Sequence, residues 1–206
     1  TKVLDWLSDE SVEETLMGKV TVIPVVNVSG FEESIREVWE DEEDLNRQFG
    51  FEEPNTPSQQ IAKDLTSEIL QICTAGIDCH DSGSTSILTP HSRIHISDKL
   101  DCVSCTREMA QLLGTEIVLE REGEPNMMAV VLNNKYHIEA LTIEIGGAGI
   151  VYDSESMLDV GFKGIQNILR GYGVLPGDIE MTKRQEFLPN RVYKQAPFAG
   201  VFESHV

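Results

Sequence analysis

Short apolar runs alternate with segments of helical periodicity along this chain, and that alternation constrains the fold more than any other feature. The apolar, strand-like runs lie at 19–31, 73–80, 93–96, 116–119 and 140–145. Helical patterns with one apolar face lie between or after them, at 57–70, 104–113 and 157–169. Strands that alternate with helices are typical of α/β folds, in which helices cover the faces of a largely parallel or mixed sheet.

The first apolar run, KVTVIPVVNVSGF at 19–31, is rich in β-branched residues, as strands buried on both faces are. We therefore expect a strand over Lys19 to Val28. The preceding segment, 3–16, carries apolar residues near helical spacing and predicts a helix. A Pro-Gly turn and a polar stretch indicate a boundary near Lys183, so we expect a main domain over 1–183 and a β-like segment over 184–206.

The chain is strongly acidic, with 35 Asp and Glu against 16 Lys and Arg in 206 residues and a formal net charge of −19. Nucleic acids and anionic membranes are polyanions, so this charge argues against both as partners. Excess acid also suits very high salt, so a halophilic source and an ordinary acidic cytosolic protein both stay open. No apolar run approaches the ~18 residues of a membrane span and no signal-peptide pattern begins the chain, so we expect a cytoplasmic protein.

Three short motifs carry polar side chains at predicted loops or strand ends. They are DLNR at 44–47, IDCHDSGS at 77–84 and TIEIGG at 142–147. Ligands in open α/β sheets bind beyond the carboxyl ends of the strands. We therefore expect a functional site where these three motifs meet.

Two residues in these motifs each have a functional and a structural interpretation. His80 follows a predicted strand, a place that suits a metal ligand, with Asp78 available to hydrogen-bond its ring; a hydrogen-bonded structural histidine is the alternative. Glu144 lies between Ile143 and Ile145, and a carboxylate buried there must be neutral, paired or catalytic. A structural ion pair is the alternative for Glu144.

Asn46 and Arg47 follow five consecutive acids at 40–44. An amide beside a guanidinium can bind a carboxylate, because the planar guanidinium donates two parallel hydrogen bonds. An ion pair between Arg47 and one of the preceding acids explains the residue equally well.

The three motifs, in this order and spacing, resemble those of the succinylglutamate desuccinylase/aspartoacylase family, a branch of the zinc-carboxypeptidase superfamily. The most specific parts are DLNRQFG at 44–50, IDCH at 77–80, TPHSR at 89–93 and TIEIGG at 142–147. The resemblance extends from about Gly18 to Gly177. It implies a zinc-peptidase-like three-layer α/β/α sandwich with a mixed sheet, followed by the start of a small β-rich C-terminal domain.

The resemblance also implies roles for five residues. His80 would be a ligand of Zn²⁺, the implied cofactor, and Glu144 would be the general base that activates zinc-bound water. Asn46 and Arg47 would hold a substrate carboxylate, and Arg93 would help to hold the acyl or amino-acid part. The implied partner is a small anionic amide substrate.

The family takes its other two zinc ligands from a His-x-x-Glu motif shortly before the strand predicted at 19–28. No histidine precedes His80 in this chain. Either the motif lies upstream of Thr1 in a longer protein, or the protein has lost its metal. We favour the first explanation, because the pattern at 3–16 indicates a chain that begins inside a helix.

Two further departures concern the oxyanion and the C-terminus. The family places an arginine a few residues before DLNR to polarise the scissile carbonyl, whereas this chain has Trp39 there and its nearest arginine is Arg36. The last residues, PNRVYKQAPFAGVFESHV, resemble only the opening strands of the family's β-rich domain.

The leading hypothesis is a zinc-dependent hydrolase that cleaves the amide bond of an N-acyl amino acid or a similar small anionic amide. A zinc carboxypeptidase acting on peptides is an alternative, because the same residues would serve it. A metal-free carboxylate-binding pseudoenzyme is a third; the missing His-x-x-Glu supports it, whereas a binder has little use for a buried base at Glu144. A homo-oligomer is also possible.

Overall fold

The computed structural model describes residues 2–81, 88–96, 103–145, 154–181, 184–189, 191–198 and 200. Its helices are α1 (Lys2–Leu7), α2 (Glu10–Glu13), α3 (Val28–Glu33), α4 (Pro57–Glu68), α5 (Val103–Leu113), α6 (Met128–Val131) and α7 (Ser154–Gly171). Its strands are β1 (Ala75–His80), β2 (His91–His95), β3 (Ile117–Arg121), β4 (Glu139–Glu144) and β5 (Glu186–Leu188). The described residues also include two 3₁₀ turns, η1 (Leu45–Arg47) and η2 (Leu70–Ile72), and a π turn, η4 (Leu132–Tyr136).

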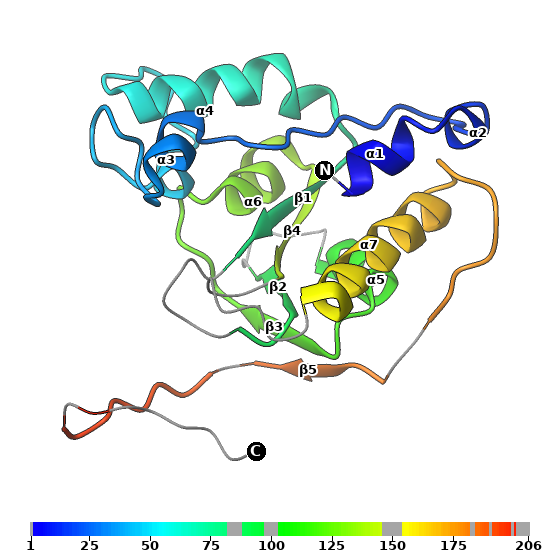
Figure 1. Cartoon of the computed structure of the whole chain (residues 1–206). Coiled ribbons are helices and arrows are strands. Elements are labelled where there is room, and N and C mark those ends of the chain that lie inside the picture. The colour runs from blue at the N-terminus through cyan, green and yellow to red at the C-terminus, as the bar shows by residue number, and fades with distance from the viewer. Residues whose placement is uncertain are drawn as a thin grey trace.

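The strands form one mixed sheet in the order β1-β4-β2-β3-β5 (Figure 1). β1 runs parallel to β4, and β2, β3 and β5 run parallel to one another. β2 is antiparallel to β4, which makes the sheet mixed, as expected. Because β2 is antiparallel to β4, the start of β2 lies at the same edge of the sheet as the ends of β1 and β4.

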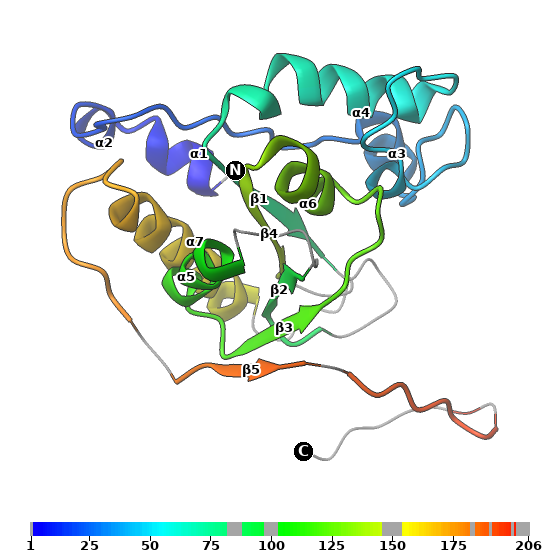
Figure 2. The same cartoon turned by 180° about the vertical axis from the view of Figure 1, so that it is seen from behind.

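Helices cover both faces of the sheet (Figures 1 and 2). The side chains of β4 alternate between these two faces. Ala140 packs in the cluster formed with α4 and α6, whereas Leu141 and Ile143 pack in the cluster formed with α5 and α7. All three residues are fully buried, and each large aliphatic side chain contributes about 1.5–3 kcal/mol. The three-layer α/β/α arrangement is therefore confirmed.

Local sequence signals set the ends of the helices. Thr56 caps α4 by accepting a hydrogen bond from the Gln59 amide, and Pro57 occupies the first helical position, where its missing N–H costs nothing. Gly114 follows α5 with φ of +76°, the left-handed conformation that commonly ends a helix. These helices and the strands at 75–80, 91–95, 117–121 and 139–144 agree with the predicted elements to within a few residues.

The first apolar run is not a strand, so the prediction for Lys19 to Val28 was wrong. The segment forms no ladder with any described strand, Pro24 has no amide to donate, and Val26 and Val28 are 40% and 56% exposed. The Asn27 side chain accepts from the Gly30 amide and caps α3 instead. A β-branched run becomes a strand only where a neighbouring backbone is available to pair with it.

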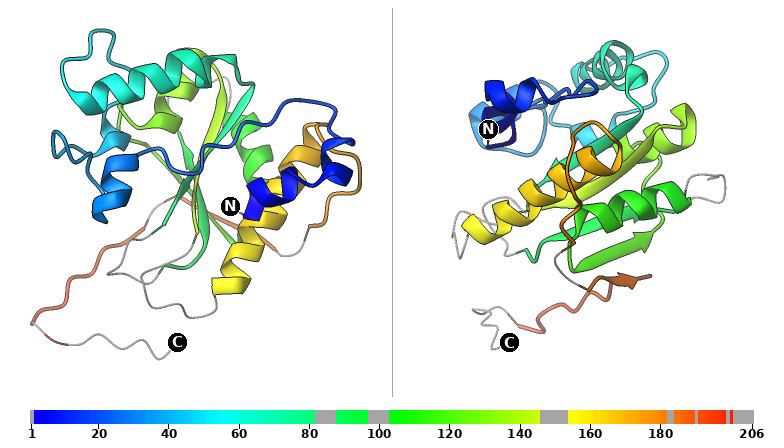
Figure 3. Two further views of the ribbon diagram at one scale, coloured as in Figure 1. Left: turned by 45° about the horizontal axis from the view of Figure 1, so that its top comes forward. Right: turned by 90° about the vertical axis from the view of Figure 1, so that its right-hand side faces the viewer.

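The helix predicted over 3–16 divides into α1 and α2. The Asp9 side chain accepts a hydrogen bond from the Ser11 amide and starts a second helix. α1 lies beside α7 (Figure 3). The rings of Trp6 and Phe162 meet edge to face there, with centroids 5.4 Å apart.

The last described residues extend the main sheet before they leave it. β5 pairs with β3, so residues 186–188 share the sheet of the main domain. Residues 191–198 run away from the body in an extended path (Figure 3), and Val192 is 85% exposed. The division into 1–183 and 184–206 stays a prediction. In the described part of the chain, no helix is long and apolar enough to cross a membrane.

Candidate active site

Three strand ends bring the predicted site residues together. His80 ends β1 and Glu144 ends β4, and the two are register partners. Glu144 is also the register partner of His91, the first residue of β2. Because side chains alternate between the faces of a strand, Asp78 and Arg93 lie on the same face as these three.

Asn46, a residue of η1, connects this cluster to the start of α6. Its side-chain nitrogen donates to Asp78 Oδ2 over 3.0 Å and lies 2.9 Å from His80 Nε2. Its side-chain oxygen accepts from the Met128 amide over 2.8 Å. Asn46 is only 8% exposed, so its amide is engaged on both sides within the protein.

His80 has the environment of a metal ligand. Its Nε2 lies 3.0 Å from Asp78 Oδ2. In the tautomer with the ring proton on Nε2, Asp78 accepts that proton and the Nδ1 lone pair is available to a metal. Burial of the ring lowers the pKa of His80, but the hydrogen bond and charge of Asp78 outweigh burial and raise the pKa above its ordinary value. Zinc binding would require the unprotonated ring.

The residues that the structure describes do not supply the other ligands of a metal site. No group of three His, Cys, Asp or Glu side chains among them is placed to hold a metal ion. His80 thus fits one position of a zinc site. The two remaining ligand positions of a catalytic zinc have no counterpart in this part of the chain.

Arg47 is already paired on two sides. Its Nε lies 2.5 Å from Glu124 Oε2, and its Nη1 donates to the Asn46 carbonyl over 2.7 Å. Asp44 Oδ2 lies 3.7 Å from Nη1. Asp44 also accepts a hydrogen bond from Arg36 Nε over 3.0 Å. Arg36, the nearest arginine before the DLNR motif, is therefore paired with the first residue of that motif.

Glu144 and Arg93 form a buried ion pair. Arg93 Nη2 lies 2.8 Å from Glu144 Oε1, and the two side chains are 13% and 9% exposed. Burial lowers the pKa of the Arg93 guanidinium, while the charge of Glu144 raises it. The carboxylate is therefore held by one oxygen, and Oε2 has no partner among the described residues.

His91 lies two residues before Arg93 on the same face of β2 and contacts it. The His91 Nδ1 atom lies 2.9 Å from the Thr89 carbonyl, and Arg93 Nε donates to His91 Nε2 over 3.2 Å. This arrangement assigns the proton to Nδ1. Burial lowers the pKa of His91, which agrees with a neutral ring that accepts from Arg93.

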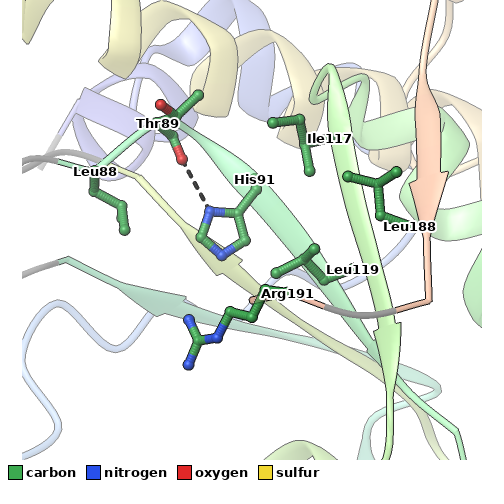
Figure 4. A pocket seen from close by; sticks show the side chains of 7 residues that line it. All are labelled: Leu88, Thr89, His91, Ile117, Leu119, Leu188 and Arg191. Carbon is green, nitrogen blue, oxygen red and sulfur yellow. Dashed lines mark hydrogen bonds between the residues drawn. The ribbon is translucent and has the colours of Figure 1, made fainter. Parts of the chain in front are cut away.

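A pocket of about 340 Å³ opens beside His91 (Figure 4). Its lining is mostly aliphatic and consists of Leu88, Thr89, His91, Ile117, Leu119, Leu188 and Arg191. His91 both lines the pocket and contacts Arg93, so the pocket begins next to the residue that holds Glu144. It can admit a small apolar group.

The structure thus brings His80, Glu144, Arg93, Asn46 and Arg47 into one region. Residues 82–84 of the IDCHDSGS motif and Gly146 and Gly147 of TIEIGG lie outside the described residues. Sequence reasoning did not foresee Glu124 or His91. The alternation of His91, Arg93 and His95 along one strand was an available signal, since it places three polar side chains on one face.

The fold defines a class of protein, the α/β/α sandwiches with a mixed sheet. Residues 1–172 match the succinylglutamate desuccinylase/aspartoacylase catalytic domain. The match covers more than half of the chain, and the chain belongs to that family.

Several relatives are similar over nearly the whole chain. An N-alpha-acetyl-L-2,4-diaminobutyric acid deacetylase of Halomonas elongata is 23% identical over 97% of this chain. A succinylglutamate desuccinylase/aspartoacylase structure from Rhodobacter sphaeroides matches 89% of the chain with 26% identity and a TM-score of 0.77. The product-bound ectoine utilization protein EutE (DoeB) of Ruegeria pomeroyi matches 91% with 21% identity and a TM-score of 0.80.

The chain is shorter than each of these relatives. It spans 59% of the Halomonas deacetylase, and 54% and 57% of the Rhodobacter and Ruegeria chains. The similarity therefore covers little more than half of each relative.

Proposed function

We propose that this protein is a zinc-dependent hydrolase that cleaves the amide bond of an N-acyl amino acid. Two facts support the proposal: the chain belongs to a family of deacylases, and a relative that is 23% identical is by name a deacetylase of an N-acetyl amino acid. The single structural observation that carries it is Glu144, a buried carboxylate fixed at the meeting point of three strands.

Glu144 has the geometry of a general base. Arg93 holds one of its oxygens and so fixes the orientation of the carboxylate. The other oxygen, Oε2, which no described residue contacts, would accept a proton from water. Glu144 would then pass that proton to the leaving amine. The pocket beside His91 would receive the acyl or amino-acid part next to Arg93.

Arg47 would bind the substrate carboxylate. Its Nε and part of its Nη1 are occupied, and its Nη2 contacts no described carboxylate, so this edge can donate to a ligand. Asn46 would act by orientation, because its backbone carbonyl holds the guanidinium and its side chain holds Asp78.

His80 would be one zinc ligand, with Asp78 fixing its ring. When bound, zinc polarises the scissile carbonyl and lowers the pKa of its water. The two further ligands would come from outside the described residues, which agrees with a chain that spans little more than half of its relatives.

A metal-free carboxylate-binding protein is the second candidate. The observation in its favour is that the described residues complete no three-ligand metal site. Zinc content measured by elemental mass spectrometry after dialysis separates the two: about one zinc per protein supports the hydrolase, and none after reconstitution supports the binder.

The proposal predicts that Glu144→Gln lowers kcat for an N-acetyl amino acid by roughly 100-fold or more, the usual contribution of a general base. KM and zinc content should change little, because Glu144 is neither the carboxylate clamp nor a ligand. Glu139→Gln is the matched control, since Glu139 begins the same strand 5 residues earlier and contacts Tyr172 instead.

Removing Glu144 also leaves Arg93 buried without its partner, so folding must be measured alongside activity. If Glu144→Gln does not fold, Glu144→Asp keeps the charge but withdraws the carboxylate by one methylene, and its kcat should fall in the same way. A folded variant of either kind with wild-type kcat contradicts the assignment.

A further inference from the structure

The face of the sheet that carries the site changes from polar to aliphatic between its two edges. One row of register partners crosses β1, β4, β2 and β3 and consists of His80, Glu144, His91 and Ile117. Register partners lie side by side on the same face, so the polar and the aliphatic side chains share one surface. Neighbouring strands lie about 4.8 Å apart, so the backbone of Ile117 is roughly 10 Å from that of Glu144.

A second row of register partners, two residues further along β2, ends on two leucines. It consists of Arg93 of β2, Leu119 of β3 and Leu188 of β5. Leu119 and Leu188 line the pocket of about 340 Å³ together with His91 (Figure 4). The pocket therefore extends from the register partner of Glu144 across β3 to β5.

The proposed carboxylate clamp lies on the opposite side of Glu144. Asn46 contacts Asp78 and His80 of β1, the strand at the other end of the strand order from β5. Arg47 follows Asn46 in η1 and donates to its carbonyl. A substrate with its amide at Glu144 and its carboxylate on Arg47 would therefore direct its acyl group toward β3 and β5.

The arginines near the pocket do not make its interior cationic. They are Arg93, Arg121 and Arg191. Arg93 Nη2 lies 2.8 Å from Glu144 Oε1, and Arg93 Nε donates to His91 Nε2, so this guanidinium is paired within the protein. Arg121 lies further along β3 and is not among the residues that line the pocket.

Arg191 borders the pocket with its aliphatic stem. Its guanidinium carbon lies 4.6 Å from the centre of the exposed ring of Tyr193, and the side chain extends away from β5 (Figure 4). A carboxylate at the end of an acyl chain would gain little from this cation, because solvent screens exposed ion pairs. An apolar chain would instead be removed from water by the aliphatic lining.

We propose that this pocket binds the acyl group of the substrate, and that the acyl group is an uncharged aliphatic chain longer than acetyl. Ile117, Leu119 and Leu188 contact the chain. The inference rests on the proposed function and assigns the acyl part of the substrate, not the amino-acid part, to the pocket. A pocket of about 340 Å³ holds several water molecules of about 30 Å³ each, so a longer chain displaces more water than acetyl does.

The test compares N-acyl alanines that differ only in the acyl group, which is acetyl, butanoyl, hexanoyl or succinyl. For the wild-type protein, kcat/KM should rise by about tenfold or more from acetyl to butanoyl and again to hexanoyl, since each buried methylene contributes about fourfold. Succinyl has as many carbons as butanoyl but ends in a carboxylate. Its kcat/KM should lie below that of the butanoyl compound.

Ile117→Phe fills the pocket while keeping a residue that strands favour. It should lower the ratio of kcat/KM for hexanoyl to that for acetyl by about tenfold or more, because the longer chain loses its room. Leu158→Phe is the control, since Leu158 is an exposed aliphatic residue of α7, on the other face of the sheet. Its ratio should stay within about twofold of wild type.

Leu188→Phe is the second variant, because Leu188 lies in the short strand β5, is partly exposed and lines the same pocket. If Ile117→Phe does not fold, Leu188→Phe should show the loss of the hexanoyl preference. A wild-type preference for succinyl over butanoyl, no gain with chain length, or a folded pocket variant with the wild-type ratio would overturn the inference.

Calorimetric binding of the same compounds, with the same variants, keeps this test separate from the proposed function. If no compound is hydrolysed but the hexanoyl compound binds more tightly than the acetyl compound and loses this advantage in Ile117→Phe, the hydrolase proposal fails and the pocket assignment stands. If compounds are hydrolysed without any dependence on chain length, only the pocket assignment fails.

Discussion

At the scale of single residues, burial decides what each histidine of β2 can do. His95 is 2% exposed, its Nε2 lies 3.0 Å from Thr142 Oγ1, and its Nδ1 has no partner in the described part of the chain. Burial is the main cause that lowers the pKa of His95 to about 4. His95 is therefore a neutral ring, and the loop that contains Gly123 and Glu124 packs against it at Gly123.

The low pKa of His95 predicts acid sensitivity. The unfolded chain takes up a proton near pH 6.5 and the folded protein only near pH 4, so stability is present above pH 6.5 and falls as the pH drops through this window. Urea unfolding at pH 8 and pH 5 should show roughly 2 kcal/mol of this loss from His95.

The variant His95→Gln keeps a polar group near Thr142 but cannot titrate, so its loss of stability between pH 8 and pH 5 should be smaller than that of wild type. His137→Asn, at an exposed histidine with φ of 55°, is the control and should retain the wild-type pH dependence. Equal pH dependence in the wild type and the His95 variant would contradict the assignment.

At the scale of elements, α7 lies unusually close to the end of α5. A Cβ atom at Gly164 would lie 2.4 Å from the Leu113 carbonyl oxygen, which is backbone and cannot turn aside. A Cβ atom at Gly161, one turn earlier, would meet only the tip of the Ile145 side chain at 2.2 Å. The contact between the two helices therefore depends on glycine at 164 and much less on glycine at 161.

Gly164→Ala should destabilise the protein by about 1–3 kcal/mol, because the added methyl pushes α7 away from α5. Gly161→Ala is the matched control: it gains the same helix propensity of about 1 kcal/mol, and the Ile145 tip can rotate away. Chemical unfolding of both variants measures the difference. Equal stability of the two would show that α7 can shift without cost.

The elements that could be predicted are those whose pattern is local. The cap at Thr56, the glycine after α5 and the apolar faces of α4 and α5 are signals within a few residues, and each predicted helix formed there. The run at 19–28 carried the strongest strand composition of all and is not a strand, because pairing depends on a neighbour that composition does not reveal.

At the scale of the whole molecule, the net charge of −19 is the main electrostatic influence on stability. Surface acids that repel one another favour the unfolded chain, in which they lie farther apart, and salt weakens this repulsion. The acids are not all free: Asp41 accepts hydrogen bonds from the Ser58 amide and hydroxyl at the start of α4, over 2.9 and 2.6 Å.

The melting temperature should therefore rise with KCl. Between 0.05 and 1 M we expect an increase of about 5 °C or more, which roughly 2 kcal/mol of relieved repulsion produces in a domain of this size. Screening is nearly complete at about 1 M, where the Debye length is about 3 Å. A further rise above 1 M would support a halophilic protein, and no rise below it would contradict the repulsion argument.

The sequence by itself determined the fold class and the family, and it predicted the site residues His80, Glu144, Asn46 and Arg47, because these depend on motifs within a few positions. The tertiary structure decided what each of them contacts. Glu144 pairs with Arg93 because β2 runs against β4, and Glu124 reaches Arg47 across 77 positions of chain because its loop is fixed on His95 and Phe49. Contacts between distant segments follow from the packing of the whole chain, so no local pattern records them.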